Sequence, residues 1–111
     1  FSKRHQYGGN RNSGIWMIGN ALRLYERSAP GVLFHDMLAC NEYTSGTEQA
    51  AKVACPALLI LGAEDRLTPL RSTRALQEAI PSPLVEVLPG AGHMIMVEAP
   101  NDMLDALHKV L

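Results

Sequence analysis

Two short apolar runs constrain the fold of this chain most strongly. Residues 57–61 (ALLIL) and residues 84–88 (LVEVL) are each bounded by proline or glycine. The first run is unbroken, which is typical of a strand that is buried on both faces of a parallel sheet. The sequence therefore predicts two strands, which become a parallel pair if a crossover connects them.

The segment between the two runs predicts that crossover. Thr68 and Pro69 form a hydroxyl cap followed by a proline, which is tolerated in the first turn of a helix. Apolar residues then recur at helical spacing until Pro81 ends the element. A strand, a helix and a parallel strand form a right-handed unit, so both strands end at the same edge of the sheet. Open α/β sheets bind their ligands at that edge.

One titratable residue stands in the loop after each strand. Asp65 follows the first run and His93 follows the second, 28 positions later (93 minus 65). Neighbouring strands lie about 5 Å apart, so we expect the carboxylate and the imidazole to meet above the sheet. In such a pair the acid accepts a hydrogen bond from one ring nitrogen, and the other nitrogen takes a proton from a nucleophile.

Both loops carry motifs of a known family. Residues 62–69 (GAEDRLTP) resemble the acid loop of α/β-hydrolases, and residues 90–93 (GAGH), followed by residues 98–100 (EAP), resemble the histidine loop. The two motifs stand in the order that the family uses. The resemblance implies an α/β fold: the C-terminal part of an α/β-hydrolase, with parallel strands, flanking helices and an N-terminal helical lid segment.

The resemblance implies that Asp65 is the catalytic acid and His93 the base. Taken singly, Asp65 is more typical of a capping carboxylate, and His93 could be a structural loop histidine; the pair together favours catalysis. Glu64, beside Asp65, is a weaker alternative acid. We expect Glu98 to anchor the loop or the helix that begins at Pro100, because a negative charge is favourable at a helix start.

The nucleophile that such a pair would serve is missing from this sequence. No serine lies in a Gly-x-Ser-x-Gly turn between a strand and a helix, and no aspartate or cysteine occupies such a turn. The sequence also begins with Phe1 rather than methionine. We therefore expect the chain to be the C-terminal part of a longer enzyme whose nucleophile lies upstream.

Two helices are predicted before the first strand. The first is expected to begin at a Ser13 cap and to run through about Arg27, with Arg23 and Arg27 opposite its apolar face. The second is expected from Val32 to about Tyr43. By their place in the resemblance, residues 1–50 form a helical lid or cap, and residues 51–111 form the hydrolase core.

The lid interpretation gives three candidates for a substrate pocket. Trp16 and Met17 would offer apolar area from the first helix, and Met94 would do so from beside the histidine. Packing against the rest of the enzyme is the alternative for the helix. Residues 94–97 are otherwise expected to pack beneath the histidine loop.

Charge and cysteine usage exclude several other classes. The net charge is −1 with no long run of either sign, so nucleic-acid binding is not expected. No apolar stretch approaches the roughly 20 residues of a membrane span. Cys40 and Cys55 have neither metal-binding nor Cys-x-x-Cys spacing, so we expect buried free thiols in a reducing, cytoplasmic compartment.

The expected function is that of a serine-type hydrolase, which cleaves a small, apolar, ester-like substrate without a cofactor or metal. The family that the chain resembles also includes enzymes that split carbon–carbon or carbon–halogen bonds or form peracids. A non-catalytic binding or assembly module is the alternative. Because a two-stranded sheet leaves both edges open, we expect the chain to pack against the upstream part of the enzyme or against another copy of itself.

Overall fold

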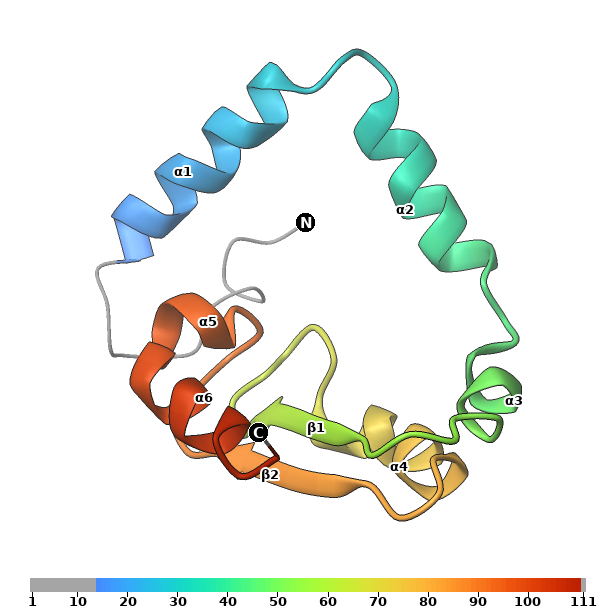
Figure 1. Ribbon diagram of the computed structural model, residues 1–111. Coiled ribbons are helices and arrows are strands. Elements are labelled where there is room, and N and C mark those ends of the chain that lie inside the picture. Colours follow the sequence, from blue (N-terminus) through green and yellow to red (C-terminus); the bar gives the residue numbers. More distant parts are fainter. Residues whose placement is uncertain (1–13, 111) are drawn as a thin grey trace.

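The computed structural model describes the backbone of residues 14–110 and the side chains of residues 18–110. Within this range the chain forms helices and two strands (Figure 1). In order, the elements are α1 (Gly14–Arg27), α2 (Val32–Glu42), α3 (Gly46–Ala50), β1 (Leu58–Gly62), the 3₁₀ turn η1 (Leu70–Thr73), α4 (Arg74–Ala79), β2 (Leu84–Leu88), α5 (Ile95–Glu98) and α6 (Pro100–Leu107).

The two strands pair in parallel, as the apolar runs predict. Leu58 lies opposite Leu84, and the register continues to Gly62 opposite Leu88. The strand β1 begins and ends one residue later than the run at 57–61, so Gly62 belongs to the sheet. The connection between the strands contains α4, which confirms the crossover and places both following loops at one edge.

The start of the crossover helix differs from the prediction. Pro69 precedes the 3₁₀ turn, no side chain caps either η1 or α4, and the regular helix begins only at Arg74. The Thr68 hydroxyl instead donates a hydrogen bond to Oδ2 of Asp65. The prediction of a Thr68 cap is wrong because the regular helix begins only at Arg74, beyond the reach of Thr68, whose side chain turns back to Asp65.

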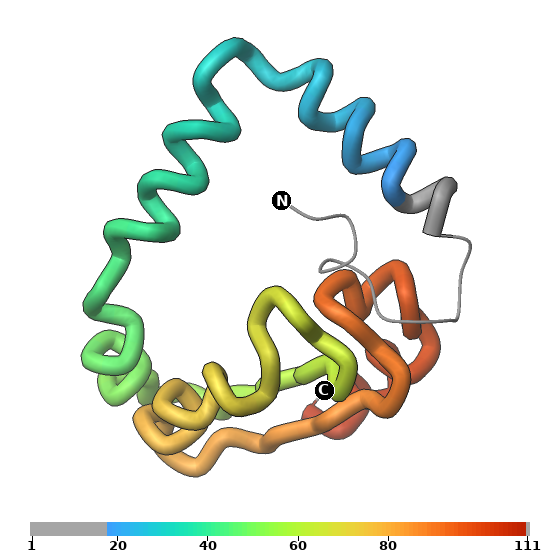
Figure 2. The backbone as a smooth tube through the Cα atoms, turned by 180° about the vertical axis from the view of Figure 1, so that it is seen from behind, coloured from blue at the N-terminus to red at the C-terminus, as the bar shows by residue number. Residues whose placement is uncertain are grey.

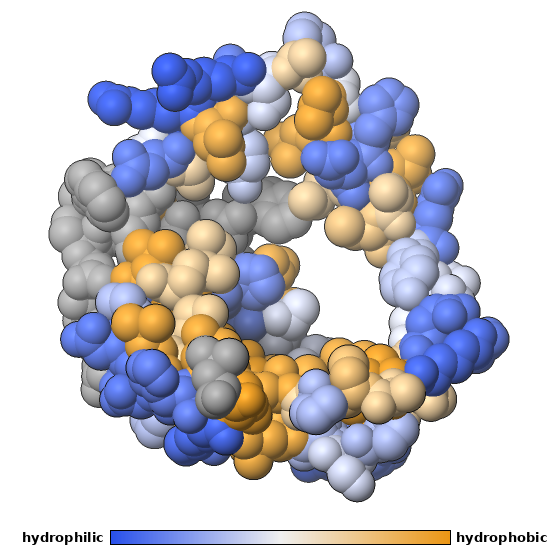
Figure 3. All heavy atoms as spheres, viewed as in Figure 1, coloured by the Kyte–Doolittle hydropathy of each residue, from blue (hydrophilic) through white to orange (hydrophobic). Residues whose placement is uncertain are grey.

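The helices α1 and α2 form an arch over the strand layer, and α2 leads through α3 to the strands (Figures 1 and 2). The predicted ends of both helices are correct to within one residue, whereas the proposed Ser13 cap lies outside the described residues. An opening remains between α2 and the strand layer in the space-filling view (Figure 3). The helix α2 buries none of its residues.

The compact part of the molecule lies around β2, the histidine loop and the last two helices. Leu88, Ala91 and Ala99 are buried together. Three half-buried apolar side chains pack against them: Ile60, Ile95 and Met103. This cluster fixes the backbone on both sides of the histidine loop.

The expected burial of the two cysteines is wrong. Both thiols are unbonded and exposed. Cys40 lies on α2, which has no buried residue, and Cys55 lies in the connection that precedes β1. Their apolar character does not bury them, because neither segment is covered by another described part of the chain.

None of the helices in the described part of the chain is long and apolar enough to cross a membrane.

Candidate active site

The two loops that leave the strands are joined to each other through their backbones. The N–H of Ala63 donates to the carbonyl oxygen of Leu88 at 3.0 Å, and the N–H of Glu64 donates to that of Ala91 at 2.9 Å. The ladder of the parallel sheet thus continues into the loops. This continuation sets the position of the acid relative to the histidine.

Close approach of the loops requires a glycine at the end of β1. A Cβ atom on Gly62 would lie 2.6 Å from the carbonyl oxygen of Ala91, and closer still to that of Gly92. Gly90 supplies the turn at the start of the histidine loop with a φ of 71°, a conformation that other residues rarely adopt. The sequence marks Gly62 as a strand boundary and as the start of the acid-loop motif, but it does not indicate this close approach.

Asp65 and His93 meet at the carboxyl ends of the strands, as predicted. Oδ2 of Asp65 lies 3.0 Å from Nδ1 of His93. The Asp65 side chain is only 8% exposed, whereas the imidazole is 33% exposed. The carboxylate is therefore shielded while one side of the imidazole remains accessible. Glu64, the alternative acid, is exposed.

Short-range hydrogen bonds hold the Asp65 carboxylate in place. Oδ1 accepts the backbone N–H groups of Leu67 at 2.8 Å and Thr68 at 2.9 Å. Oδ2 accepts the Thr68 hydroxyl at 2.7 Å, and the same hydroxyl oxygen lies 3.3 Å from Nδ1 of His93. Thr68 therefore touches both members of the pair. An aspartate followed three residues later by threonine is a local motif that could have revealed this contact.

These contacts decide the protonation state of the acid. Burial by itself raises the pKa of Asp65, but the hydrogen bonds from Thr68, His93 and Leu67 outweigh it and hold the pKa below its usual range. An ionised carboxylate only accepts hydrogen bonds. Nδ1 of His93 is therefore the donor in this contact, and in the neutral ring Nε2 is the acceptor.

A buried carboxylate supports the histidine loop from below. Glu98 is 5% exposed. Its Oε2 accepts the N–H of Gly92 at 2.9 Å, and its Oε1 accepts the N–H of Met94 at 3.1 Å. The expectation that Glu98 anchors this loop is confirmed.

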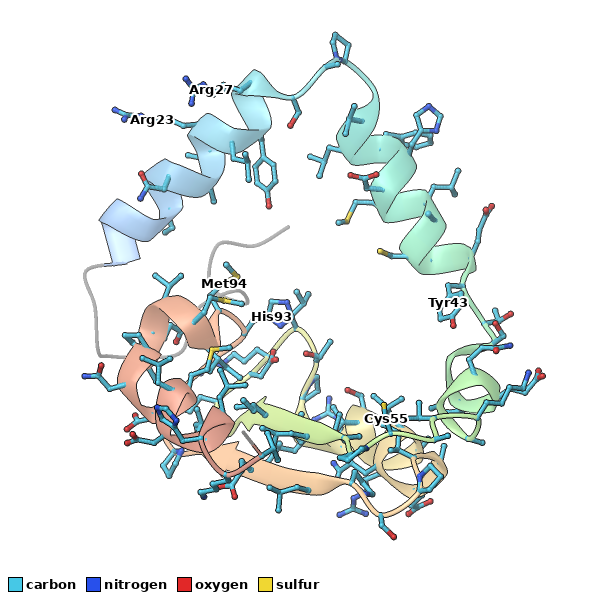
Figure 4. The ribbon with its side chains drawn as sticks, in the orientation of Figure 1. Arg23, Arg27, Tyr43, Cys55, His93 and Met94 are labelled. Carbon is cyan, nitrogen blue, oxygen red and sulfur yellow. The ribbon has the colours of Figure 1, made fainter. Side chains whose placement is uncertain are left out.

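The pocket candidates differ in how far the structure describes them. Met94 is half-buried beside His93, and both lie on the side of the strand layer that faces the arch (Figure 4). The side chains of Trp16 and Met17 lie outside the described residues, so their role in a pocket stays a prediction. Arg23 and Arg27 point away from the space enclosed by the arch, as the sequence pattern predicts (Figure 4).

The described residues contain no group of three or more histidine, cysteine or acidic side chains that could hold a metal ion. The site is instead an acid hydrogen-bonded to a histidine at the carboxyl ends of adjacent parallel strands. This arrangement is typical of the α/β class of hydrolases.

Comparison with known proteins gives the family. A model of the alpha/beta hydrolase fold matches residues 2–100, so the chain belongs to that family. The solved structure of a thermophilic esterase superposes with a TM-score of 0.75 at 27% sequence identity, over 96% of this chain and 42% of that chain.

Two relatives with assigned names are hydrolases. "Putative carbamate hydrolase RutD" of Caulobacter sp. (strain K31) is 36% identical over 54 residues, which are 49% of this chain and 20% of the relative. The pimeloyl-[acyl-carrier protein] methyl ester esterase of Chromobacterium violaceum is 34% identical over 58 residues, which are 52% of this chain and 23% of the relative. The matches thus span about a fifth of the length of these relatives.

Proposed function

We propose that this chain supplies the acid and the base of a serine-type hydrolase that cleaves a small, apolar, ester-like substrate. The hydrogen bond between Asp65 and His93 is the observation that carries the proposal. An esterase and a carbamate hydrolase among the similar proteins support the substrate class. The nucleophile belongs to the part of the enzyme that precedes this sequence, since the family order is nucleophile, acid, histidine.

The reaction assigns one task to each side chain. Nε2 of His93 takes the proton of the nucleophile as it attacks the substrate carbonyl, and gives it to the leaving group. Water then cleaves the acyl-enzyme with His93 again as the base, which returns the proton to the nucleophile. Asp65 keeps the proton on Nδ1 and stabilises the imidazolium that forms. Backbone amides outside this chain hold the oxyanion. The sequence of steps requires no cofactor.

We propose that the arch is a lid that helps to form the substrate pocket. Apolar side chains are exposed along both helices, including Leu24 at 66% and Phe34 at 65%. His93 is partly exposed and lies on the side of the strand layer that faces the arch, which supports this assignment (Figure 4). Trp16, Met17 and Met94 are the candidates for lining it. Either the upstream part of the enzyme or a second copy of the chain covers the remaining apolar surface.

A cytoplasmic location is part of the same proposal. Cys40 and Cys55 are both unpaired and exposed. Exposed thiols remain reduced most readily in a reducing compartment.

Replacing His93 by alanine in the complete enzyme tests the catalytic role. We expect turnover of p-nitrophenyl esters to fall about 10³-fold or more, because the nucleophile loses its base. His108→Ala is the matched control, because this histidine is exposed beyond the end of α6. Retention of a tenth of the rate by the His93 variant would exclude the role. A complete protein without any turnover would favour the non-catalytic alternative.

Asp65→Asn tests the partner of the base. The amide cannot favour the Nδ1–H tautomer as a carboxylate does, so we expect a loss of about 10³–10⁴-fold in kcat. Glu64→Gln in the same loop is the control. If the control loses the activity and Asp65→Asn keeps it, the acid is Glu64.

A further inference from the structure

Glu98 is a buried carboxylate that the proposed reaction does not use. It is the last residue of α5, and it is 5% exposed. Burying an ionised group is costly unless hydrogen bonds compensate for the lost water. The backbone N–H groups of Gly92 and Met94 supply two such bonds, one to each carboxylate oxygen.

The two amides flank the catalytic histidine in the chain. Glu98 therefore binds the backbone immediately before and immediately after His93. The carboxylate is itself held by its surroundings, because Ala99, the next residue, is buried with Leu88 and Ala91. Hydrogen bonds to a charged acceptor are stronger than neutral ones, so this contact resists rotation of the loop.

We propose that Glu98 is a positioning residue for His93, which fixes the loop backbone so that Nδ1 reaches Asp65 and Nε2 faces the nucleophile. The inference rests on the proposed function, which it deepens. The contacts that support this role are those of the Glu98 carboxylate with the backbone N–H groups of Gly92 and Met94.

The requirement for glutamate follows from the two acceptors. Glutamine has the same shape but offers only one oxygen, and its NH₂ group would face a backbone N–H. One buried donor would then lose its partner, and the loop would move. Aspartate is one methylene shorter, so it cannot span both amides from the same backbone position.

Glu98→Gln in the complete enzyme tests the proposal. We expect kcat to fall roughly 10–100-fold with KM changed less than about twofold, because a displaced base slows chemistry more than it weakens binding. The downfield NMR resonance of the Nδ1 proton, which reports the bond to Asp65, should shift or disappear. Asp105→Asn removes the same charge from an exposed position on α6 and should leave both readouts unchanged.

A merely structural role would lower the melting temperature of Glu98→Gln without moving the Nδ1 resonance or kcat, and that result would overturn the proposal. If Glu98→Gln does not fold, Glu98→Asp keeps the charge and is judged by the same two readouts. The resonance also separates this inference from the proposed function. Should His93→Ala retain turnover, the proposed function fails, while the Nδ1 proton still shows whether Glu98 positions the ring.

Discussion

The Asp65 carboxylate illustrates what single residues contribute to this site. Its pairing with His93 is predictable, because both residues follow apolar strands whose ends must coincide. Its bond with Thr68 is harder to predict, because Thr68-Pro69 also matches a helix start, although the spacing of Asp65 and Thr68 matches a local turn motif. A cap uses the threonine hydroxyl as an acceptor, whereas here the Thr68 hydroxyl donates to Asp65 and caps neither η1 nor α4.

Thr68→Val should therefore reduce stability in a pH-dependent manner. The pKa of folded Asp65 is lowered, so its contribution is present above the unfolded value of about 3.9 and is lost as the pH falls through the folded value. Removing the Thr68 hydroxyl brings the pKa of Asp65 in the folded state closer to its pKa in the unfolded state. We expect urea unfolding of the enzyme at pH 7 to show a loss of about 1.5–3 kcal/mol.

Below the folded pKa of Asp65 the difference between Thr68→Val and the unaltered enzyme should shrink, because the carboxyl is then protonated in both. Thr68→Ser keeps a hydroxyl and should restore most of the stability at pH 7. A loss that is the same at acid and neutral pH would mean that the methyl packing of Thr68, and not its hydroxyl, is responsible.

At the scale of elements, strands and long helices are predictable and short turns are not. The apolar runs and the helical stripes each repeat a local pattern, so β1, β2, α1 and α2 lie within a residue or so of their predicted bounds. The four residues of α5 are too few to show a period, and they read as an apolar loop. This turn forms where Glu98 binds the amides of Gly92 and Met94, which is a contact of the folded loop.

Gly62→Ala tests the contact between β1 and the histidine loop. The new Cβ would collide with the carbonyl oxygens of Ala91 and Gly92, which are backbone atoms in a buried turn. We expect a loss of about 1–3 kcal/mol in the free energy of unfolding, together with lower kcat.

Gly19→Ala is the matched control for that substitution. Gly19 lies in α1, and its added Cβ would meet nothing within 4 Å. An alanine inside a helix is favoured over glycine by about 0.5–1 kcal/mol, so this variant should be slightly stabilised. Equal destabilisation of both variants in urea would show that the contact at Gly62 is not the cause.

At the scale of the whole molecule, the chain has many apolar residues but few packing partners for them within its described part. The sequence is 47% hydrophobic, yet no large side chain among the described residues is fully buried. Composition gives the amount of apolar surface in the chain, but it does not say which segment packs against that surface. For that reason the sequence predicted two buried cysteines, and the structure leaves both exposed.

The exposed arch should bind a hydrophobic dye when the chain is isolated. Leu24 and Phe34 are the most exposed of the large apolar side chains that the structure describes on the arch. Fluorescence of anilinonaphthalene sulfonate should rise on adding the chain, and Leu24→Gln with Phe34→Gln should reduce the rise. Asn20→Gln is the control, because it changes an exposed residue of α1 without altering the charge or the exposed apolar side chains. Dye binding that is unaffected by the double substitution would place the exposed surface elsewhere.

The backbone hydrogen bonds between the two loops have a consequence for an enzyme that is cleaved into two fragments. The hydrogen bonds described between the acid loop, the histidine loop and Glu98 lie within residues 62–98, including Ala63 to Leu88, Glu64 to Ala91 and Glu98 to Gly92. A proteolytic nick between α2 and β1 would leave these contacts untouched. The acid and the base would then remain paired in one fragment. A separately made segment that carries the nucleophile could bind to this fragment without rearranging the pair.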